Sequence, residues 1–318
     1  MQKFWNRIGI CIILICVVSV SAYAQSLVPG GQVIGLELGD NTVTVAAFDE
    51  ALGADAKAAG LKIGDQILSV NGKTVHTAAD VRHALERSAG VVELTVERNK
   101  KSDTVRFSPI ITEDGPKLGV YLKQGVTGIG TVTWYDPDTG RFGTLGHGVN
   151  NPRGELLHMV SGNAYKAGVV SVRKGACGNP GQLMGALREA TPMGTLYKNT
   201  PRGIFGITEK GFSGTPIDLG TAHTGKAIIR STVQGDTVQE YSVEILKVYP
   251  NAGTSGRNIL LKVTDPALLE VTGGIVQGMS GSPIIQDGKL VGAVTHVLVN
   301  DPTTGYGIFI ENMLDAAA

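Results

Sequence analysis

Short runs of Val, Ile and Thr, separated by Gly, Asn and Asp, recur along most of this chain, and this pattern limits the fold more than any other feature. Segments such as GTVTWY and VVELTVER have the length and the β-branched or alternating composition of strands. The 44 glycines supply the turns that many short strands require. We therefore expect a mainly β protein, and a chain of 318 residues is long enough for two domains.

The start of the chain has the pattern of an export signal. Lys3 and Arg7 precede the apolar run Ile8–Val20, and Ala22–Ala24 form a small-x-small cleavage pattern. The apolar run is shorter than the roughly 20 residues that a membrane-spanning helix needs, but an uncleaved anchor stays open as an alternative. We expect residues 1–25 to be a signal peptide or membrane anchor and the protein to leave the cytosol.

Charge and cysteine content exclude several classes of partner and site. The 28 Lys and Arg residues balance 28 Asp and Glu residues, so the net charge favours neither nucleic acid nor an acidic membrane surface as the main partner. Cys177 is the one cysteine after the N-terminal segment, which rules out an internal disulfide framework there. The sequence shows no metal-ligand spacing and no phosphate-binding loop, so we expect no metal and no cofactor.

Residues 32–110 have a self-contained pattern. The strand QILSV is followed by Asn71–Gly72, a dipeptide typical of hairpin turns. Thr77–Asp80 fits a capping box at the start of a helix on which Val81 and Leu85 share one face. Alternating strands close the segment, so we expect a small β domain covered by one helix.

This order of elements resembles the PDZ domain of bacterial exported proteases. The resemblance implies a peptide-binding groove along a strand at Ile34, Gly35 and Leu36. Val81 and Leu85 of the helix would form the opposite wall. An extended peptide would add to the strand, and backbone N–H groups would hold its terminal carboxylate. The alternative is that the helix only covers the sheet.

Residues 116–318 again show short strands and tight turns, a pattern that suits a β-barrel or sandwich. His147 lies where a strand gives way to a loop, and Gly278–Pro283 reads GMSGSP. A serine hydroxyl attacks only when a base takes its proton and backbone donors stabilise the oxyanion. Gly278 can adopt a conformation closed to other residues and point its N–H inward, while Gly281 removes a side chain that would obstruct substrate.

The GMSGSP motif and the strand after it resemble the nucleophile loop of chymotrypsin-like serine proteases, which reads Gly-Asp-Ser-Gly-Gly-Pro. The resemblance places the base at His147, the orienting acid at Asp265 and the nucleophile at Ser280, in the chain order His, Asp, Ser. It implies a chymotrypsin-like double β-barrel. The backbone N–H groups of Gly278 and Ser280 would form its oxyanion hole.

Other residues compete for these roles. His296 is the rival base, although a place in the lining of the substrate cleft suits it better, and Ser282 is the rival nucleophile. Asp265 could equally cap a helix, because Asp followed by Pro is typical of a helix start. The remaining candidates for the orienting acid are Asp218 and Asp236.

A narrower resemblance runs from Val28 to about Leu314. It is carried by the segments GTLGHGVN, VTDPALLEVTGGIVQGMSGSPI and VTHVLVNDPTTGYGIFIENML. They resemble the stage IV sporulation protein B peptidase family, the signalling serine peptidases of endospore-forming bacteria. This implies export into the forespore intermembrane space, self-cleavage, and cleavage of a membrane-bound regulator of an intramembrane protease. The intramembrane protease would then process a late sigma factor precursor.

Two other functions stay open. A non-catalytic PDZ adaptor would bind the tail of a membrane protein and keep the second domain as a scaffold. A PDZ-containing quality-control protease of the envelope would cut many substrates, but such enzymes usually place the PDZ domain after the protease domain, whereas here it comes first.

Overall fold

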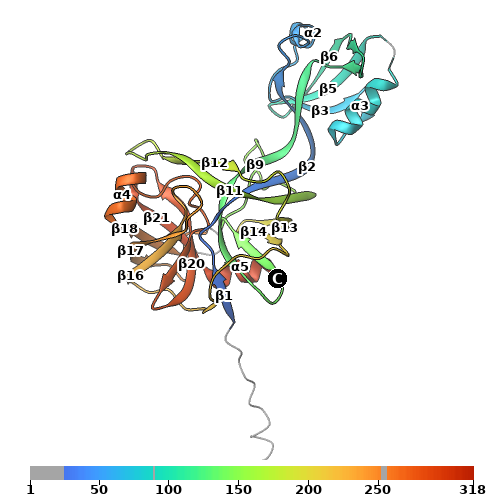
Figure 1. Cartoon of the computed structure of the whole chain (residues 1–318). Helices are drawn as coiled ribbons and strands as arrows, with labels where there is room; N and C mark the ends of the chain where they lie inside the picture. The colour runs from blue at the N-terminus through green and yellow to red at the C-terminus, as the bar shows by residue number, and fades with distance from the viewer. Residues whose placement is uncertain (1–24, 89, 252–255) are drawn as a thin grey trace, which may run out of the picture.

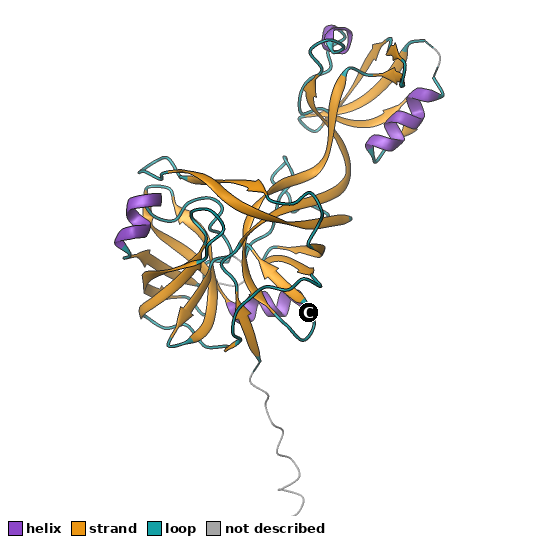
Figure 2. Cartoon of the chain, viewed as in Figure 1, coloured by secondary structure: helices purple, strands orange, loops and turns teal. Residues whose placement is uncertain are grey.

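The computed structural model describes residues 25–88, 90–251 and 256–318, and its elements are mostly β-strands (Figure 1, Figure 2). The expected mainly β class is confirmed. The expected export segment lies outside the described residues, apart from its last position. Within the described ranges, no helix is both long and apolar enough to cross a membrane.

Three groups of elements make up the molecule. The first barrel and the strands attached to it are β1 (Ser26–Pro29), β2 (Val33–Phe48), β9 (Val120–Tyr135), β10 (Arg141–Thr144), β11 (Ser161–Arg173), β12 (Gln182–Leu187), β13 (Gly194–Thr200), β14 (Gly203–Ile207) and β15 (Ile217–Asp218). The small upper body in Figure 1 adds α2 (Ala54–Ala58), β3 (Gln66–Val70), β4 (Lys73–Thr74), α3 (Ala78–Glu86), β5 (Val92–Arg98), β6 (Lys101–Phe107), β7 (Ile110–Thr112) and β8 (Gly115–Lys117). The second barrel and two helices are β16 (Gly225–Ser231), β17 (Gln239–Val248), β18 (Ile259–Val263), α4 (Pro266–Thr272), β19 (Pro283–Gln286), β20 (Lys289–Leu298), β21 (Asp301–Phe309) and α5 (Ile310–Ala317).

The first barrel closes because β2 pairs with β9 as well as with β11. The ring runs β9-β10-β14-β13-β11-β2, and all of its pairings are antiparallel. Ile34, Leu36 and Leu38 alternate along β2 and are buried in its core with Val132 and Phe142. This period of two is what a strand with one inward face requires.

The second barrel is the closed ring β16-β17-β18-β21-β20-β19. Its interior is filled by branched aliphatic side chains such as Ile229, Val243 and Leu261. Helix α5 then joins the two barrels, because Met313 packs in one cluster with Trp134 of the first barrel. The expected chymotrypsin-like double barrel is therefore the architecture of this chain.

Two long strands connect the first barrel to the small upper body (Figure 1). In the barrel, Val33–Leu38 of β2 pairs with Val126–Thr131 of β9. Beyond a break in register, Val43–Phe48 pairs with Val120–Gln124, and the same sheet continues into the small body in the order β9-β2-β3-β5-β6. The small body is thus inserted between two strands of the first barrel.

This insertion corrects the boundaries expected from the sequence, 32–110 for the small domain and 116–318 for the large one. The strand segment 33–38 belongs to the barrel, and the segment 120–124 belongs to the small domain. The pattern of a strand is the same in either sheet, so only the pairing partners could assign these segments. The helix is as expected: Thr77 accepts from the Asp80 N–H at 3.0 Å, and the Asp80 carboxylate accepts from the Thr77 N–H at 2.9 Å.

Candidate active site

Two glycines give the serine loop between α4 and β19 its shape. Gly278 and Gly281 have φ angles of 99° and 96°, a region that residues with a side chain rarely adopt. This is the conformation expected for Gly278. The reason for Gly281 differs from the expected one: a Cβ there would lie 2.0 Å from the carbonyl oxygen of Thr131, so the glycine lets the loop pack against β9.

Hydrogen bonds fasten this loop to the first barrel. The Thr131 N–H donates to the Ser280 carbonyl at 3.0 Å. The hydroxyls of Thr131 and Thr133 donate to the carbonyls of Gly278 and Gly281, both at 2.8 Å. Although Ser280 belongs to the second barrel, its backbone is therefore supported by both barrels.

Alternate N–H groups of the loop are left without a partner. Those of Gln277, Met279 and Gly281 each donate to a backbone carbonyl. Those of Gly278 and Ser280 find no acceptor among the described residues. Two unpaired N–H groups beside a serine hydroxyl are what an oxyanion hole requires.

His147 enters the site from the end of β10. Leu145 and Gly146 both have positive φ angles, 68° and 67°, and they turn the chain so that the next residue faces the second barrel. His147 Nδ1 lies 2.9 Å from the Gly148 carbonyl oxygen, which can only accept a hydrogen bond. Nδ1 therefore carries the hydrogen, and Nε2 is left as the proton acceptor. Burial lowers the pKa of His147, and the bond to Gly148 partly opposes this effect.

The His147 ring and the Ser280 hydroxyl line the same cleft, which has a volume of about 390 Å³. The hydroxyl donates to the carbonyl of Thr295 at 3.0 Å instead of to the imidazole. The hydrogen of a serine hydroxyl can turn about the Cβ–Oγ bond to another acceptor, and catalytic hydrogen bonds often form only when substrate is present. The cleft thus brings the expected base and nucleophile together, one from each barrel.

His296 also lines this cleft, as expected for it, and its ring centroid lies 5.5 Å from that of His147. Its Nδ1 is buried with no hydrogen-bond partner among the described residues. Burial lowers the pKa of His296 to about 4, and repulsion by His147 in its protonated form and by Arg257 adds to this shift. His296 is therefore neutral at physiological pH.

Asp265 is a helix cap in the structure. Its carboxylate accepts from the N–H groups of Leu268 at 3.0 Å and Ser242 at 3.2 Å, and Pro266 stands at the first turn of α4. Neither bond goes to His147, so the geometry corrects the expectation of an orienting acid in favour of the alternative. The order His, Asp, Ser could not separate the two roles, because an aspartate before a proline has the same sequence pattern in both.

The other competitors are engaged elsewhere. Ser282 is fully buried, and its hydroxyl lies 3.1 Å from that of Ser231 in the second barrel. Asp218 accepts from the Ser26 hydroxyl, and Asp236 forms an ion pair with Arg188. These contacts leave Ser280 as the serine that faces the cleft.

Nothing in the sequence pointed to Asn199, whose side chain organises the loop after His147. Its amide oxygen accepts from the Val149 N–H at 3.0 Å, and its amide nitrogen donates to the carbonyls of Val149 and Leu157, both at 2.9 Å. These three bonds fix the backbone next to Gly148, the carbonyl partner of His147. In sequence Asn199 stands in an ordinary strand and turn pattern, YKNTPRG, so it carried no signal of this role.

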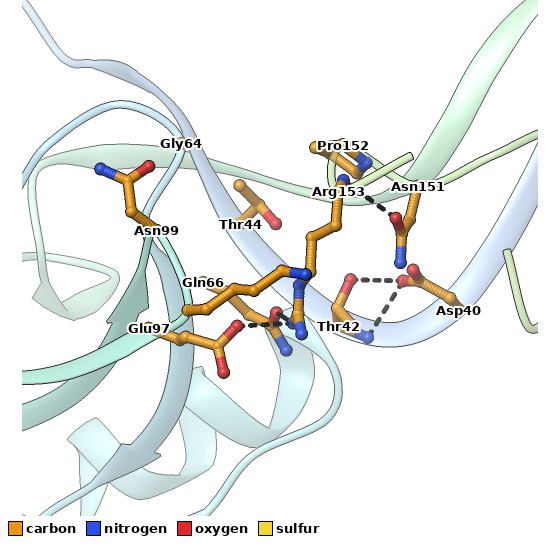
Figure 3. Close-up of a pocket in the computed structure, with 11 residues that line it drawn as sticks. Asp40, Thr42, Thr44, Gly64, Gln66, Glu97, Asn99, Asn151, Pro152 and Arg153 are labelled. Atoms are coloured by element: carbon orange, nitrogen blue, oxygen red, sulfur yellow. Dashed lines mark hydrogen bonds and ion pairs between the residues drawn. The ribbon is translucent and has the colours of Figure 1, made fainter. Parts of the chain in front are cut away.

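The same loop touches the inserted domain (Figure 3). The guanidinium of Arg153 lies 2.8 Å from the carboxylate of Glu97 and 2.5 Å from the amide oxygen of Gln66. A longer pair, 3.9 Å, joins Lys100 to Glu155. The loop that follows His147 is therefore attached to β13 on one side and to the small domain on the other.

The structure leaves no groove at the place expected for peptide binding. Ile34, Gly35 and Leu36 pair on both edges, with β9 and with β11, so no peptide can add there. Val81 and Leu85 instead line a cleft of about 450 Å³ whose other wall includes 118–122. This part of β9 pairs only with β2 among the described residues, which leaves an edge beside α3. The groove strand was missed because it comes from a distant part of the chain.

Two family models match this chain. The model of the SpoIVB peptidase S55 family matches residues 114–314, more than half of the chain, and a PDZ-domain model matches residues 53–98. A similar solved structure is described as "Crystal structure of Rv3671c protease, inactive form"; the identity is 15%, the TM-score is 0.36, and 59% of this chain and 82% of that chain are covered. A comparison with curated proteins finds no match. With its peptidase region matched almost from end to end, this chain belongs to the SpoIVB peptidase S55 family of serine peptidases and carries a PDZ domain.

Proposed function

We propose that this serine peptidase uses Ser280 as its nucleophile and His147 as its general base. The observation that carries the assignment is the cleft between the barrels, where the hydroxyl, the imidazole and the two unpaired N–H groups of the serine loop come together. The tautomer of His147 supports it, because the hydrogen on Nδ1 leaves Nε2 able to take a proton.

The proposed reaction is acyl transfer to serine. Nε2 of His147 takes the proton of the Ser280 hydroxyl while Oγ bonds to the carbonyl carbon of the substrate, and the N–H groups of Gly278 and Ser280 donate to the resulting oxyanion. The imidazolium then gives its proton to the leaving nitrogen as the C–N bond breaks. Water attacks the acyl-enzyme with His147 again as base, and the proton returns to Ser280 as the carboxylic acid product leaves.

The support of His147 is unusual for this chemistry. Its Nδ1–H donates to the neutral carbonyl of Gly148, where the serine protease triad has a carboxylate. A carbonyl fixes the tautomer and the ring orientation as a carboxylate does, but it adds no full negative charge to stabilise the imidazolium. Burial lowers the pKa of His147, and the bond to the Gly148 carbonyl raises it again only in part.

The lining of the cleft indicates which residue the substrate presents. Besides the catalytic groups, the walls are mostly aliphatic side chains, and no charged residue lines the cleft among the described residues. The aliphatic residues are Ile129, Leu145, Val149, Ile275, Val276 and Val297. We therefore expect cleavage after an apolar residue and a penalty for Asp, Glu, Lys or Arg at that position.

The wider role follows from the family and the N-terminal pattern. We propose an exported sporulation signalling peptidase in the forespore intermembrane space. It would cut itself and a membrane-bound regulator, and release of an intramembrane protease would then allow processing of a late sigma factor precursor. The match to the SpoIVB family and the signal-like residues 1–25 support this role. In a spore-forming host that lacks the protein, wild type should restore precursor processing and Ser280→Ala should not.

Mass spectrometry after incubation of the purified protein tests the catalytic assignment. Wild type should generate self-cleavage products, and Ser280→Ala and His147→Ala should generate none. Ser282→Ala is the matched control, because it changes the neighbouring buried serine and should retain cleavage. A Ser280→Ala protein that cuts at the wild-type rate would refute the assignment.

A serine-directed phosphonate separates the peptidase from the adaptor alternative. The folded wild type should be labelled at Ser280, whereas a folded protein that stays unlabelled would be an adaptor. A peptide library addresses the quality-control alternative, since a signalling peptidase should cut few sequences and a quality-control enzyme many.

A further inference from the structure

A β-hairpin from the first barrel reaches over the serine loop of the second. Strands β11 and β12 form this hairpin, and its tip, residues 174–183, lies near α4 (Figure 1). The Gly175 N–H donates to the Thr272 carbonyl at 2.8 Å, and the Gly178 N–H donates to the Val299 carbonyl at 2.9 Å. The tip is therefore bound to the end of α4 and to the turn after β20.

The strongest connection is made to Gln277, the residue before Gly278. The Gln277 N–H donates to the Gly181 carbonyl at 3.0 Å, and the Leu183 N–H donates to the Gln277 carbonyl at 2.8 Å. The two segments run parallel at this bridge. Both backbone groups of Gln277 are thus held by the hairpin tip.

This contact determines where the Gly278 N–H points. The structure has no cis peptide bond among its described residues, and in a trans peptide the C=O and the N–H point in opposite directions. Because the Gln277 carbonyl points at Leu183, the N–H on the other side of that peptide points away from the hairpin. If the Gln277–Gly278 peptide flipped, the Gly278 N–H would point out of the oxyanion hole.

We propose that the hairpin tip positions the oxyanion hole, with the Leu183 N–H as the positioning donor that holds the Gln277–Gly278 peptide in its active orientation. This inference deepens the proposed function and rests on Ser280 being the nucleophile. Side-chain packing reinforces the contact, since Leu183 is only 1% exposed and belongs to the core of the second barrel. A Cβ at Gly278 would lie 3.0 Å from the Leu183 Cβ, so the two backbones approach closely.

Proline at position 183 tests this role directly. Leu183 pairs with Val172 in the β11–β12 ladder, but its N–H points away from β11 and donates to Gln277, so Leu183→Pro removes this bond and no donor of the ladder. Leu183→Ala is the matched reference, because it loses the buried side chain but keeps the N–H. Relative to Leu183→Ala, Leu183→Pro should lower kcat about 100-fold, the scale of losing one oxyanion donor, with KM within about threefold.

A second readout separates positioning from a general loss of structure. A peptide aldehyde forms a hemiacetal with Ser280 whose oxygen occupies the oxyanion hole, so its affinity should fall with kcat in Leu183→Pro. Binding of the intact peptide, measured with Ser280→Ala added to each variant, should stay unchanged. Equal kcat and equal aldehyde affinity in folded Leu183→Pro and Leu183→Ala would overturn the proposal.

Gly181→Ala replaces the proline variant if the latter does not fold. A Cβ at Gly181 would lie 2.4 Å from the Arg173 carbonyl oxygen, so the segment beside Gln277 must shift while Leu183 stays intact. Its kcat should fall with little change in KM, and an unchanged kcat would overturn the proposal. If Ser280→Ala itself still cuts, the catalytic assignment has failed, an outcome distinct from failure of the hairpin role.

Discussion

The two walls of the proposed catalytic cleft are built in different ways. The serine wall is one short segment whose glycines at 278 and 281 fix its backbone and pack it against β9. The histidine wall depends on residues far away in the chain, with Asn199 on one side of the loop and Arg153 reaching the inserted domain on the other. The backbone conformation of the serine loop can thus be expected from its own sequence, whereas the contacts that hold the loop after His147 cannot.

The largest effect should come from the serine wall. Gly281→Ala would place a Cβ 2.0 Å from the Thr131 carbonyl oxygen at a φ of 96°, so the loop must move. Because a displacement of about 1 Å can cost about 100-fold in rate, we expect kcat to fall by at least that factor. Gly288→Ala is the control: its φ is also positive, 75°, but its Cβ would meet open space. Peptide cleavage and thermal unfolding should show a small stability loss and normal kcat for the control.

The histidine wall should respond to Asn199→Ala. This variant breaks three hydrogen bonds and leaves backbone groups of Val149 and Leu157 without their partner, which costs about 1–3 kcal/mol of unfolding free energy. We expect kcat to fall roughly tenfold, since loosening the base costs less than displacing the nucleophile. Asn163→Ala, which breaks one bond to Glu37 away from the loop, should keep kcat near wild type. Equal kcat values for the two variants would show that Asn199 does not help to hold His147 in place.

The histidine wall also gives stability a pH dependence, because His147 and His296 are both half-buried and desolvation lowers their pKa values. The pKa of His296 is lowered to about 4, so in the range between about 4 and its ordinary value near 6.5 the unfolded chain binds more protons than the folded one. Stability should therefore fall as the pH drops through that window, and His147 acts in the same direction.

Urea unfolding at several pH values checks this dependence. His296→Gln should lose less stability than wild type between pH 6.5 and pH 4. His223→Gln is the control, because the bonds of His223 to the Thr224 carbonyl and to Asp287 raise its pKa, and its removal should not lessen the acid sensitivity. An identical pH slope in wild type and His296→Gln would show that His296 protonates as easily in the folded state as in the unfolded state.

The smallest effect should come from Asp265→Asn. Asparagine caps a helix about as well as aspartate, so kcat should stay within about threefold and the unfolding free energy should change little. Asp265→Ala should lose about 1 kcal/mol through the missing cap. If turnover by folded Asp265→Asn instead fell by about three orders of magnitude, the carboxylate would be part of the catalytic machinery.

The inserted domain shows where prediction from sequence stopped. Its helix and capping box are as expected, because both depend on residues that lie within one turn of each other. A groove beside the helix was expected at Ile34–Leu36, whereas the strand that lines the cleft beside α3 is Val120–Leu122, since both segments have the pattern of a strand beside a glycine. Pairing between residues distant in the chain decides which of two such strands lies next to the helix.

The sequence by itself determined the mainly β class, the serine loop and the histidine at a strand end, because turns, alternation and positive φ at glycine are local properties of the chain. Only the tertiary structure decided that Asp265 caps α4, that Gly148 and Asn199 support His147, and that Gly281 packs on Thr131. The contacts of Asp265 with Ser242, of Asn199 with Val149 and of Gly281 with Thr131 each join segments that are distant in the chain. Residue type and spacing do not specify such long-range contacts, because the same aspartate, asparagine or glycine fits several local patterns equally well.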